Sequence, residues 1–362
     1  MQTLASFRIE SIEVRALSVP LVDPFVIASG RVDATRSALV RVRLASGEKG
    51  IGEGAALPPV TREDQGDVIA DVQRAASIVV SREAQRVEEI AEVLASEVGP
   101  VARAAIETAL LDALARREGV SVRELLGGAR GAATRAMVTD ITIPILDVAR
   151  MAELARVWRG RGFSCFKVKV GKDLDADLRA LEAVRDAAPG ATFRIDANAG
   201  FSAADAIAMA RATERLQLDV ECWEQPCAAD DLDAMAAVVA AVRAPVVADE
   251  SVATMSDLAR VRAARAADGI NLKLVKSGGP LAAYALGCAA QAADLKVMCG
   301  GMVETRLGMT AAAHVAAALG GVDFVDLDTA WLLADDPFEG GYAADGPRYT
   351  LADAPGLDLR ER

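Results

Sequence analysis

Five short segments decide the fold of this chain. They read CFKVKV at residues 165–170, TFRID at 192–196, DVECWE at 219–224, PVVAD at 245–249 and DGINLK at 268–273. Each segment is mostly apolar and ends at or next to a charged residue, and Ala-rich amphipathic stretches separate them. Short strands that alternate with helices in this way predict a parallel sheet built from β/α units.

Three further segments bring the number of predicted strands to eight. They are MVTDITI at 137–143, LKVMC at 295–299 and DFVDLD at 323–328. The residues that close seven of the strands follow one another at steps of 27, 28, 25, 24, 26 and 27: Lys169, Asp196, Glu224, Asp249, Lys273, Cys299 and Asp326. Such a step matches one strand, one helix and their loops. We therefore predict an α/β fold, a modified (β/α)8 TIM barrel of the (β/α)7β type.

The region before the barrel has a different pattern. The first 60 residues alternate apolar and polar residues, and residues 61–128 have helical spacing, which predicts an α+β capping domain. We assign Gly50-Ile51-Gly52-Glu53-Gly54 to hairpin turns and not to a dinucleotide loop, because no βαβ unit surrounds it. The expected domains are 1–133 (capping), 134–330 (barrel) and 331–362, a segment that returns to the capping domain.

Composition excludes several classes of function. The chain has 362 residues and a net charge of −12, which argues against a nucleic-acid or membrane partner. A single histidine leaves catalysis mainly to lysines and carboxylates. The five scattered cysteines fit a reducing compartment. With neither a leader pattern nor an apolar run of about 18 residues, we expect a cytoplasmic protein, with a homo-oligomer left open.

Three carboxylates close successive predicted strands: Asp196, Glu224 and Asp249. Catalytic residues of such barrels lie at the C-terminal strand ends, so these side chains should converge. Converging carboxylates repel one another, and a hard dication that prefers oxygen ligands, such as Mg²⁺, removes that repulsion. The alternative is three separate carboxylates in structural salt bridges.

Lysines flank these carboxylates in sequence. Lys167 and Lys169 lie on one face of the second predicted strand, and Lys273 closes the sixth, on the far side of the barrel. A lysine that is desolvated or near other cations has a lowered pKa and acts as a base. The alternative is that the lysines pair with the acidic residues. Lys276 is assigned to a loop or helix start, without a role.

Five motifs occur in the order of the strands: K-x-K at 167–169, D-x-N at 196–198, E-Q-P at 224–226, A-D-E-S at 248–251 and N-x-K-x-x-K-x-G-G at 271–279. Together they resemble the enolase superfamily, in particular its muconate-lactonising-enzyme subgroup. The resemblance implies one Mg²⁺ per subunit, held by the three carboxylates, and no other cofactor. His314 lies in an Ala-rich helix and is interpreted as structural.

Two further stretches resemble the dipeptide epimerases of that subgroup. They are residues 301–308, GMVETRLG, and Asp326-Leu327-Asp328. By this resemblance Asp326 and Asp328 hold the α-ammonium group of a dipeptide, and Asn198, Met302 and Lys167 also line the substrate site. A turn or helix cap is the structural alternative for the two aspartates.

The chain departs from the L-Ala-D/L-Glu epimerases in a loop of the capping domain. Their loop arginine, which meets the distal carboxylate of the substrate, aligns with Gly30, and Arg31 follows one residue later. Arg31 is a candidate replacement, and Asp140 is a candidate partner for a cationic substrate side chain. The side-chain preference therefore remains open at this point.

The sequence predicts a Mg²⁺-dependent dipeptide epimerase. One lysine removes the α-proton of the C-terminal residue, the metal stabilises the resulting enediolate, and the opposite lysine returns a proton. Which of Lys169 and Lys273 acts as the base, and which as the acid, depends on the configuration of the substrate α-carbon. Lys167 assists electrostatically. The alternatives are an N-acylamino acid racemase, an o-succinylbenzoate synthase or a cycloisomerase on the same scaffold, or a barrel that binds without catalysis.

Overall fold

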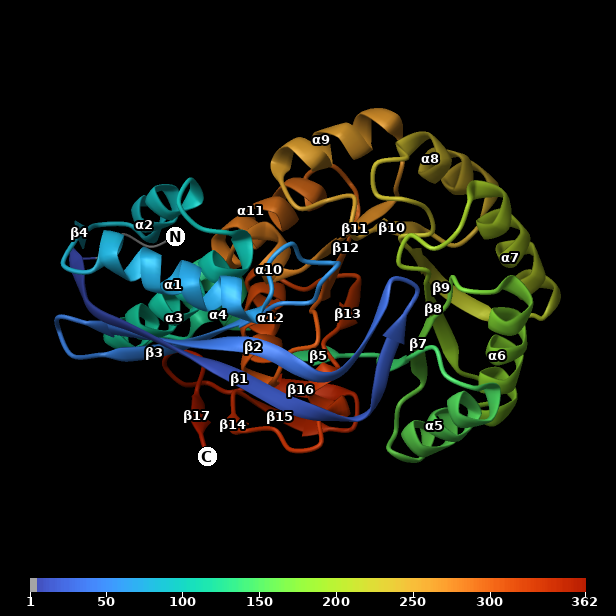
Figure 1. Ribbon diagram of the computed structural model, residues 1–362, viewed down its shortest axis with the longest axis horizontal. Helices are drawn as coiled ribbons and strands as arrows, with labels where there is room; N and C mark the ends of the chain where they lie inside the picture. The colour runs from blue at the N-terminus through green and yellow to red at the C-terminus, as the bar shows by residue number, and fades with distance from the viewer. Residues whose placement is uncertain (1–4) are drawn as a thin grey trace.

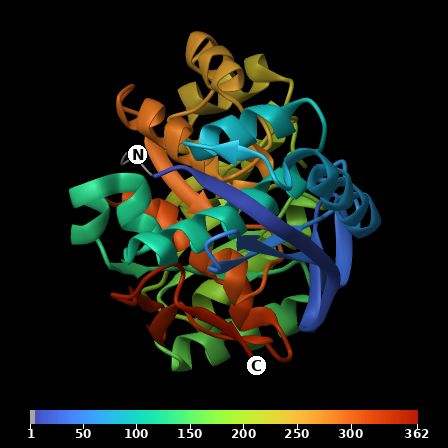
Figure 2. The ribbon, with the colours of Figure 1, turned by 90° about the vertical axis from the view of Figure 1, so that its left-hand side faces the viewer.

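An antiparallel sheet forms the N-terminal part of the computed structural model, which describes residues 5–362. Its strands are β1 (Phe7–Ile27), β2 (Gly30–Leu44), β3 (Lys49–Ala55) and β4 (Glu83–Ala84), in the order β3-β2-β1-β4. Buried and exposed residues alternate along much of β1 and β2, as their sequence pattern predicts. Figure 2, which faces this part of the molecule, shows β1 running across it.

Four helices pack with this sheet: α1 (Gln65–Val79), α2 (Val87–Ala95), α3 (Pro100–Glu118) and α4 (Val122–Ala133). Asp64 and Ser121 form capping boxes at the starts of α1 and α4. Helix α3 lies at the centre of the layer and is buried along nearly its whole length. These strands and helices give the α+β arrangement that the sequence predicts.

The glycines of β3 set the distance between the sheet and α3. A Cβ atom on Gly50 would lie 2.1 Å from the carbonyl oxygen of Ala109, and one on Gly52 would lie 2.1 Å from that of Ala105. The prediction that this glycine run forms turns was wrong, because residues 50–54 belong to a strand. The glycines are needed there for the close approach of a helix backbone.

Eight parallel strands form the barrel that follows (Figure 1). They are β6 (Ile141–Ile143), β7 (Cys165–Lys169), β8 (Thr192–Asp196), β9 (Asp219–Glu224), β10 (Val246–Ala248), β11 (Gly269–Leu272), β12 (Lys296–Gly300) and β13 (Phe324–Asp326). They are hydrogen-bonded in sequence order from β6 to β13. The predicted modified (β/α)8 barrel with an N-terminal capping domain is thus confirmed.

The barrel is nearly closed between its first and last strands. At this seam the Asp140 amide donates to the Val325 carbonyl oxygen (3.2 Å), and the Leu327 amide donates to Thr139 Oγ1 (2.8 Å). These few bonds take the place of a regular ladder. They bring the C-terminal end of β13 beside the start of β6.

Helices cover the outside of the barrel between successive strands. They are α5 (Val148–Gly160), α6 (Leu174–Ala187), α7 (Ala203–Arg215), α8 (Leu232–Ala241), α9 (Met255–Ala264), α10 (Leu274–Ser277), α11 (Pro280–Gln291) and α12 (Arg306–Ala318). Helices α10 and α11 both follow β11, and the last strand is followed by the short 3-10 helix η1 (Thr329–Leu332) in place of an α-helix. Buried His314 of α12 accepts a hydrogen bond from the Arg123 amide (3.0 Å), a contact between helices that fits its structural interpretation.

The first predicted barrel strand is divided in two. Residues 137–143 were expected to form one strand, but β5 (Ala136–Val138) leaves the barrel and only β6 remains in it. The chain changes direction at Thr139 and Asp140, whose hydrogen bonds go to the seam described above. β5 pairs instead with a strand near the C-terminus.

The C-terminal residues form four short strands: β14 (Phe338–Gly340), β15 (Tyr342–Asp345), β16 (Arg348–Leu351) and β17 (Leu359–Glu361). β16 pairs with β5, and β14 pairs with β17. The carboxylate of Glu361 forms ion pairs with Arg15 of β1 and Arg41 of β2, so this segment touches the N-terminal sheet. The boundaries at residues 133 and 330 stay predictions.

The described part of the chain contains no helix with the length and apolar character needed to cross a membrane.

Candidate active site

Six of the predicted site residues meet at the C-terminal end of the barrel. Lys167 and Lys169 lie on β7, Asp196 and Glu224 end β8 and β9, and Asp249 and Lys273 directly follow β10 and β11. All six side chains are buried, and both Asp196 and Glu224 have no exposed surface. The strand register pairs Lys169 with Asp196 and Asp196 with Glu224, which explains why they share one level.

Lys167 lies at the centre of this group. Its ammonium nitrogen is 2.7 Å from Asp326 Oδ2, 2.8 Å from Glu224 Oε2 and 3.0 Å from Asp196 Oδ2. The ammonium therefore bridges carboxylates from three strands. Lys167 lines the same cavity as Lys169 and Lys273.

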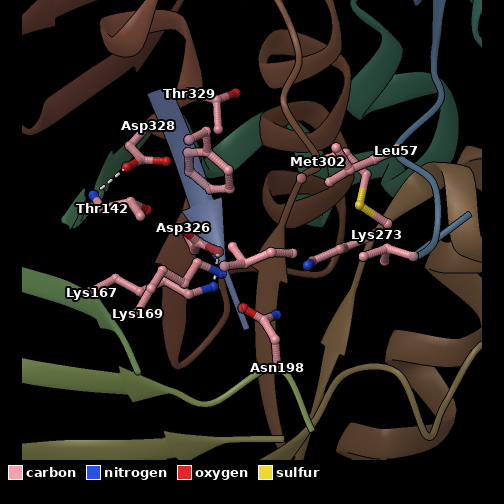
Figure 3. Close-up of a pocket in the computed structure, with 14 residues that line it drawn as sticks. Leu57, Thr142, Lys167, Lys169, Asn198, Lys273, Met302, Asp326, Asp328 and Thr329 are labelled. Atoms are coloured by element: carbon pink, nitrogen blue, oxygen red, sulfur yellow. Dashed lines mark hydrogen bonds and ion pairs between the residues drawn. The ribbon is translucent and has the colours of Figure 1, made fainter. Parts of the chain in front are cut away.

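Lys169 and Lys273 extend into the same cavity from different sides of the barrel (Figure 3). Lys169 Nζ is 2.6 Å from Asp196 Oδ2, and Lys273 Nζ is 2.7 Å from Asp249 Oδ2. Strands β7 and β11 are four positions apart around the eight-stranded sheet. Two amino groups thus face a ligand in this cavity from opposite directions.

The ion pairs determine the basicity of the lysines. Burial lowers the pKa of Lys167, but the carboxylates of Asp326, Glu224 and Asp196 outweigh that effect and raise it well above its ordinary value. Burial and Asp249 oppose each other in the same way at Lys273, and its pKa is raised. These two pKa values are raised because the ammonium groups of Lys167 and Lys273 lie beside carboxylates. The lowered lysine pKa that the sequence predicts in the presence of a dication stays a prediction.

Two residues without a predicted role position Asp249. The Lys276 ammonium contacts the Asp249 carboxylate and also lies 3.2 Å from the carbonyl oxygens of Asn271 and Val252. The side chain of Gln225 accepts a hydrogen bond from the Asp249 amide (2.8 Å). The N-x-K-x-x-K spacing carried the signal for Lys276, because it places this residue one helical turn after Lys273.

The backbone is strained beside these carboxylates. Asn198, Ala199 and Gln225 have φ angles of +41°, +63° and +34°, in the left-handed region that non-glycine residues rarely adopt. Asn198 donates its amide to Asp196 Oδ1 (2.9 Å) and its side chain to Glu250 Oε1 (3.2 Å). Such strain is typical of functional sites, where it fixes the direction of side chains.

The carboxylates of Asp196, Glu224 and Asp249 offer the hard oxygen ligands that a hard cation prefers, although in the described part of the chain their oxygens do not all lie within 4.8 Å of one another. Buried oxygens of Glu224, Asn198 and Asn271 accept no hydrogen bond, although Glu224 Oε2 lies in ion-pair range of Lys167. Burial and then the charge of Asp196 raise the pKa of Glu224 to about 7, so its charge is poorly compensated. Unpaired hard oxygens with excess negative charge are what Mg²⁺ requires.

The charge balance of the barrel interior supports the same conclusion. Seven carboxylates there outnumber the five cationic side chains beside them, and one of these cations, Arg194, is shared with Glu221. The carboxylates are Asp140, Asp196, Glu224, Asp249, Glu250, Asp326 and Asp328, and the cations are Lys167, Lys169, Arg194, Lys273 and Lys276.

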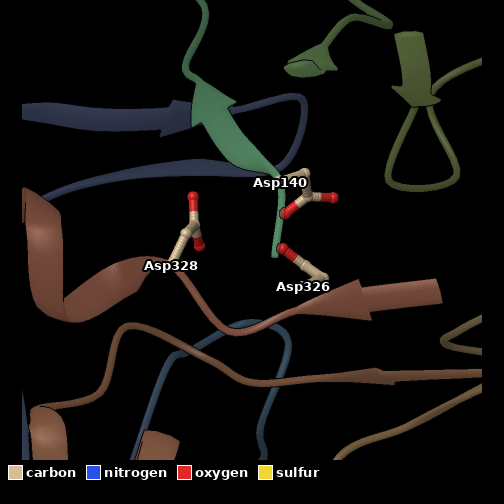
Figure 4. Close-up of side chains that lie close together, drawn as sticks. All are labelled: Asp140, Asp326 and Asp328. Carbon is tan, nitrogen blue, oxygen red and sulfur yellow. The ribbon is translucent and has the colours of Figure 1, made fainter. Parts of the chain in front are cut away.

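A second acidic group lies at the seam of the barrel. Carboxylate oxygens of Asp140, Asp326 and Asp328 are within 4.8 Å of one another (Figure 4). Asp140 is already paired, because Arg194 Nη1 donates to its Oδ2 at 2.8 Å. The other oxygen of Asp140, Oδ1, has no hydrogen-bond partner among the described residues, and Asp140 is not part of the lining of the cavity. The suggestion that Asp140 binds a cationic substrate side chain stays a prediction.

Asp326 and Asp328 differ in how well their charge is compensated. Burial acts to raise the pKa of Asp326, but the ammonium of Lys167, 2.7 Å away, outweighs burial and the pKa is lowered. Asp328 accepts the amide of Thr142 at Oδ2, but its buried Oδ1 has no hydrogen-bond donor. Burial and the charge of Asp326 raise the pKa of Asp328 to about 6. Both residues line the cavity between the lysines, where an ammonium group would compensate them.

The capping domain supplies the opposite wall of this cavity. Phe25 and Ile27 come from the end of β1, and Leu57 and Val60 come from the loop after β3. Lys169 Nζ lies 5.7 Å from the centre of the Phe25 ring. The sequence did not single out these four residues as cavity lining, because nothing in their pattern indicates where a loop will fold.

The remaining predicted site residues divide into two groups. Asn198 and Met302 line the cavity, as the resemblance implies. Arg31 does not: its side chain is 60% exposed and pairs with Asp33 at 2.9 Å. The structure therefore does not bring Arg31 to the other candidates.

The fold and these strand-end side chains define a barrel enzyme with a capping domain. The chain belongs to the enolase superfamily, since residues 150–360 match the family described as enolase C-terminal domain-like. Residues 10–127 match the mandelate racemase/muconate lactonizing enzyme N-terminal domain.

Similar proteins identify the class of reaction. An L-Ala-D/L-amino acid epimerase of Populus trichocarpa is 37% identical, over 98% of this chain and 85% of that protein. An aromatic dipeptide epimerase of Herpetosiphon aurantiacus is 36% identical, over 96% of this chain and 97% of that protein. The solved structure of the dipeptide epimerase of Enterococcus faecalis, complexed with Mg and L-Leu-L-Tyr, matches this chain with a TM-score of 0.92 and 30% sequence identity. The match covers 98% of this chain and 100% of that chain. The chain is an isomerase of this superfamily.

Proposed function

We propose that this chain is a Mg²⁺-dependent dipeptide epimerase that inverts the α-carbon of the C-terminal residue. The observation that carries the proposal is the pair of lysines, Lys169 and Lys273, on opposite sides of one cavity beside three buried carboxylates. Inversion by proton transfer needs a base on one face of the carbon and an acid on the other. This arrangement supports that chemistry directly.

The configuration of the substrate α-carbon determines which of the two lysines acts as the base and which as the acid. A deprotonated Lys169 takes the α-proton from one face, and the ammonium of Lys273 gives a proton to the opposite face; the reverse reaction uses them in the opposite order. Lys167, held by three carboxylates, supplies fixed positive charge beside the reacting carboxylate. Buried surroundings strengthen that electrostatic contribution.

Asp196, Glu224 and Asp249 would hold the Mg²⁺ ion. When bound, the ion supplies Lewis-acid stabilisation of the negative charge that develops on the substrate carboxylate. Lys276 and Gln225 fix the direction of Asp249, and Asn271 donates to Glu224 Oε1 at 2.8 Å. These contacts keep the ligands in place for the ion.

Asp326 and Asp328 would bind the α-ammonium group at the other end of the dipeptide. The unpaired Oδ1 of Asp328 and the position of both residues in the lining of the cavity support this role. The proposal explains why two carboxylates are buried where only Lys167 and Thr142 pair with them.

The wall of the capping domain supports an apolar C-terminal residue in the substrate. Phe25, Ile27, Leu57 and Val60 offer no charge to a distal carboxylate, and Arg31 lies elsewhere. A side chain of the leucine or phenylalanine type would be desolvated there at little cost. A glutamate side chain would lose its hydration without gaining a partner.

A deuterium screen tests the proposed function. Pooled L,L-dipeptides are incubated with the enzyme and Mg²⁺ in D₂O, and mass spectrometry identifies those that gain one deuterium. The alternative functions are tested in parallel, with separate pools of N-acylamino acids, of o-succinylbenzoate precursors and of muconate. We expect uptake in dipeptides with an apolar C-terminal residue; turnover confined to another pool would overturn the proposal.

A further inference from the structure

A second cavity, of about 140 Å³, lies next to the catalytic cavity beside helix α5. Leu154 and Trp158 of α5 and Trp331 of η1 form part of its lining. The rings of Trp158 and Trp331 meet edge to face with centres 6.3 Å apart, and the Phe163 ring contacts both, at 5.6 and 6.0 Å. These contacts make a rigid aromatic wall.

This second cavity shares a boundary with the catalytic one. Phe25 and Thr142 line both cavities. Thr142 donates its amide to the Asp328 carboxylate, and the Trp331 amide donates to the Asp328 carbonyl oxygen at 2.8 Å. The aromatic wall is therefore connected through the backbone to the carboxylate that would hold the substrate amine.

We propose that this cavity, the amine-side groove, binds the side chain of the N-terminal residue of the dipeptide, and that it selects a large apolar or aromatic one. The inference rests on the proposed function. The side chain and the amine of that residue share one α-carbon, so an amine held at Asp328 places the side chain beside Thr142 and Phe25. The groove begins at these two residues.

The amine-side groove is mainly apolar, although three charged side chains lie in its lining. Arg150 and Asp23 form a two-point ion pair, at 3.1 and 2.7 Å, and so compensate each other. The Arg161 guanidinium lies 4.7 Å from the centre of the Trp158 ring. Two lining valines, Val22 and Val157, are 65% and 42% exposed. A bound apolar side chain would remove that surface from water.

The test compares substrates that differ only in the N-terminal residue. Deuterium uptake is measured with Mg²⁺ for L-Leu-L-Leu, L-Phe-L-Leu and Gly-L-Leu, in wild type, Val157→Glu and Met255→Glu. Met255 is an exposed apolar residue of α9, so it controls for the new charge. We expect the wild type to favour the Leu and Phe substrates over Gly-L-Leu roughly tenfold in kcat/KM. Val157→Glu should lower that ratio about tenfold, and Met255→Glu should leave it unchanged.

Tryptophan emission gives a second readout that needs no variant. Two of the three tryptophans, Trp158 and Trp331, line the groove. L-Leu-L-Leu should change their emission more than Gly-L-Leu does at equal saturation.

The outcomes separate this inference from the proposed function. Deuterium uptake with no preference for the N-terminal residue, or equal ratios in the wild type and Val157→Glu, would overturn the groove assignment and leave the epimerase intact. That result would also point to a different occupant of the groove, such as a partner protein. Absence of uptake from every dipeptide would overturn both proposals.

Discussion

The two walls of the catalytic cavity differ in charge and in origin. The barrel wall carries buried lysines and carboxylates at strand ends, where neighbouring strands and hydrogen bonds fix each side chain. The wall of the capping domain is apolar and comes from the end of β1 and the loop after β3. Under the proposed function, the strand ends of the barrel would supply the chemistry, and the apolar wall of the capping domain would contact the side chain of the C-terminal substrate residue.

The barrel wall should be the more sensitive of the two to substitution. Glu224→Gln should reduce turnover roughly a thousandfold or more, because the proposed metal site loses a charged ligand. The melting temperature of the metal-free Glu224→Gln variant should equal or exceed that of the metal-free wild type. The reason is that burial and the nearby charge of Asp196 leave the negative charge of Glu224 poorly compensated. Asp196→Asn should lose the same activity but melt lower, because Lys167 and Lys169 lose a partner.

Two controls belong to these assays. One is wild-type enzyme treated with a metal chelator, and the other is Asp186→Asn, which removes the charge of an exposed carboxylate. Full activity in the chelated wild type would contradict a metal-dependent barrel wall.

The proposed amine site belongs to the barrel wall but lies away from the reacting carbon, so it should show an intermediate effect. Asp328→Asn removes a charge-assisted bond, which contributes on the order of 1.5–3 kcal/mol. We expect kcat/KM for a free dipeptide to fall roughly ten- to a hundredfold. Activity toward the N-acetylated dipeptide, which has no ammonium group, should not fall. A wild type equally active on both forms would argue for an N-acylamino acid racemase.

The wall of the capping domain should affect selectivity more than rate. Leu57→Ala removes apolar contact area, so kcat/KM for L-Ala-L-Leu should fall roughly tenfold. The change for L-Ala-L-Ala should be much smaller, and Met255→Ala on the surface should alter neither. Comparable losses on both substrates would show that this wall acts on the chemical step.

A charge introduced beside the same wall should change its preference. By the resemblance to the L-Ala-D/L-Glu epimerases, Gly30 aligns with their loop arginine, and an added Cβ would meet only Pro59, at 3.8 Å. Gly30→Arg should therefore raise kcat/KM for L-Ala-L-Glu, on the order of tenfold. Gly30→Ala provides the matched control. No gain with arginine would mean that the loop does not reach the C-terminal side chain.

The contact between the capping domain and the barrel should respond to pH. Glu107 of α3 is buried and accepts the Leu281 amide at 2.7 Å, and burial raises its pKa from 4.5 to about 8. The folded protein therefore binds this proton more tightly than the unfolded chain, and stability falls as pH rises from 4.5 to 8. Glu107→Gln should flatten this part of the stability curve by about 1–3 kcal/mol, whereas Glu97→Gln should not. Urea unfolding at several pH values measures the difference.

The sequence predicted the barrel wall well for a physical reason. A charged residue at the end of an apolar strand is costly unless it has a partner, so Asp196, Glu224 and Asp249 stand out at a regular spacing. Strand geometry then determines which side chains meet. The basicity of Lys167 could not be predicted, because it depends on which carboxylates its ammonium contacts.

The capping domain was less predictable, because loops and close contacts leave weaker patterns. Leu57 and Val60 reach the cavity through the path of one loop, which no periodicity encodes. Gly50 and Gly52 resembled turn residues, and only the position of α3 reveals that they permit helix packing within a strand. Arg31 is adjacent in sequence to the expected position but lies on the exposed side of the hairpin.

The central claim is that two lysines act on opposite faces of one carbon, and single-lysine variants test it most directly. Each variant is incubated in D₂O with Mg²⁺ and, separately, with the two diastereomers of one dipeptide substrate. We predict that Lys169→Ala and Lys273→Ala both lose epimerisation, and that each exchanges the α-proton of only one diastereomer, opposite to the other variant. Exchange of both diastereomers by either variant would contradict the account.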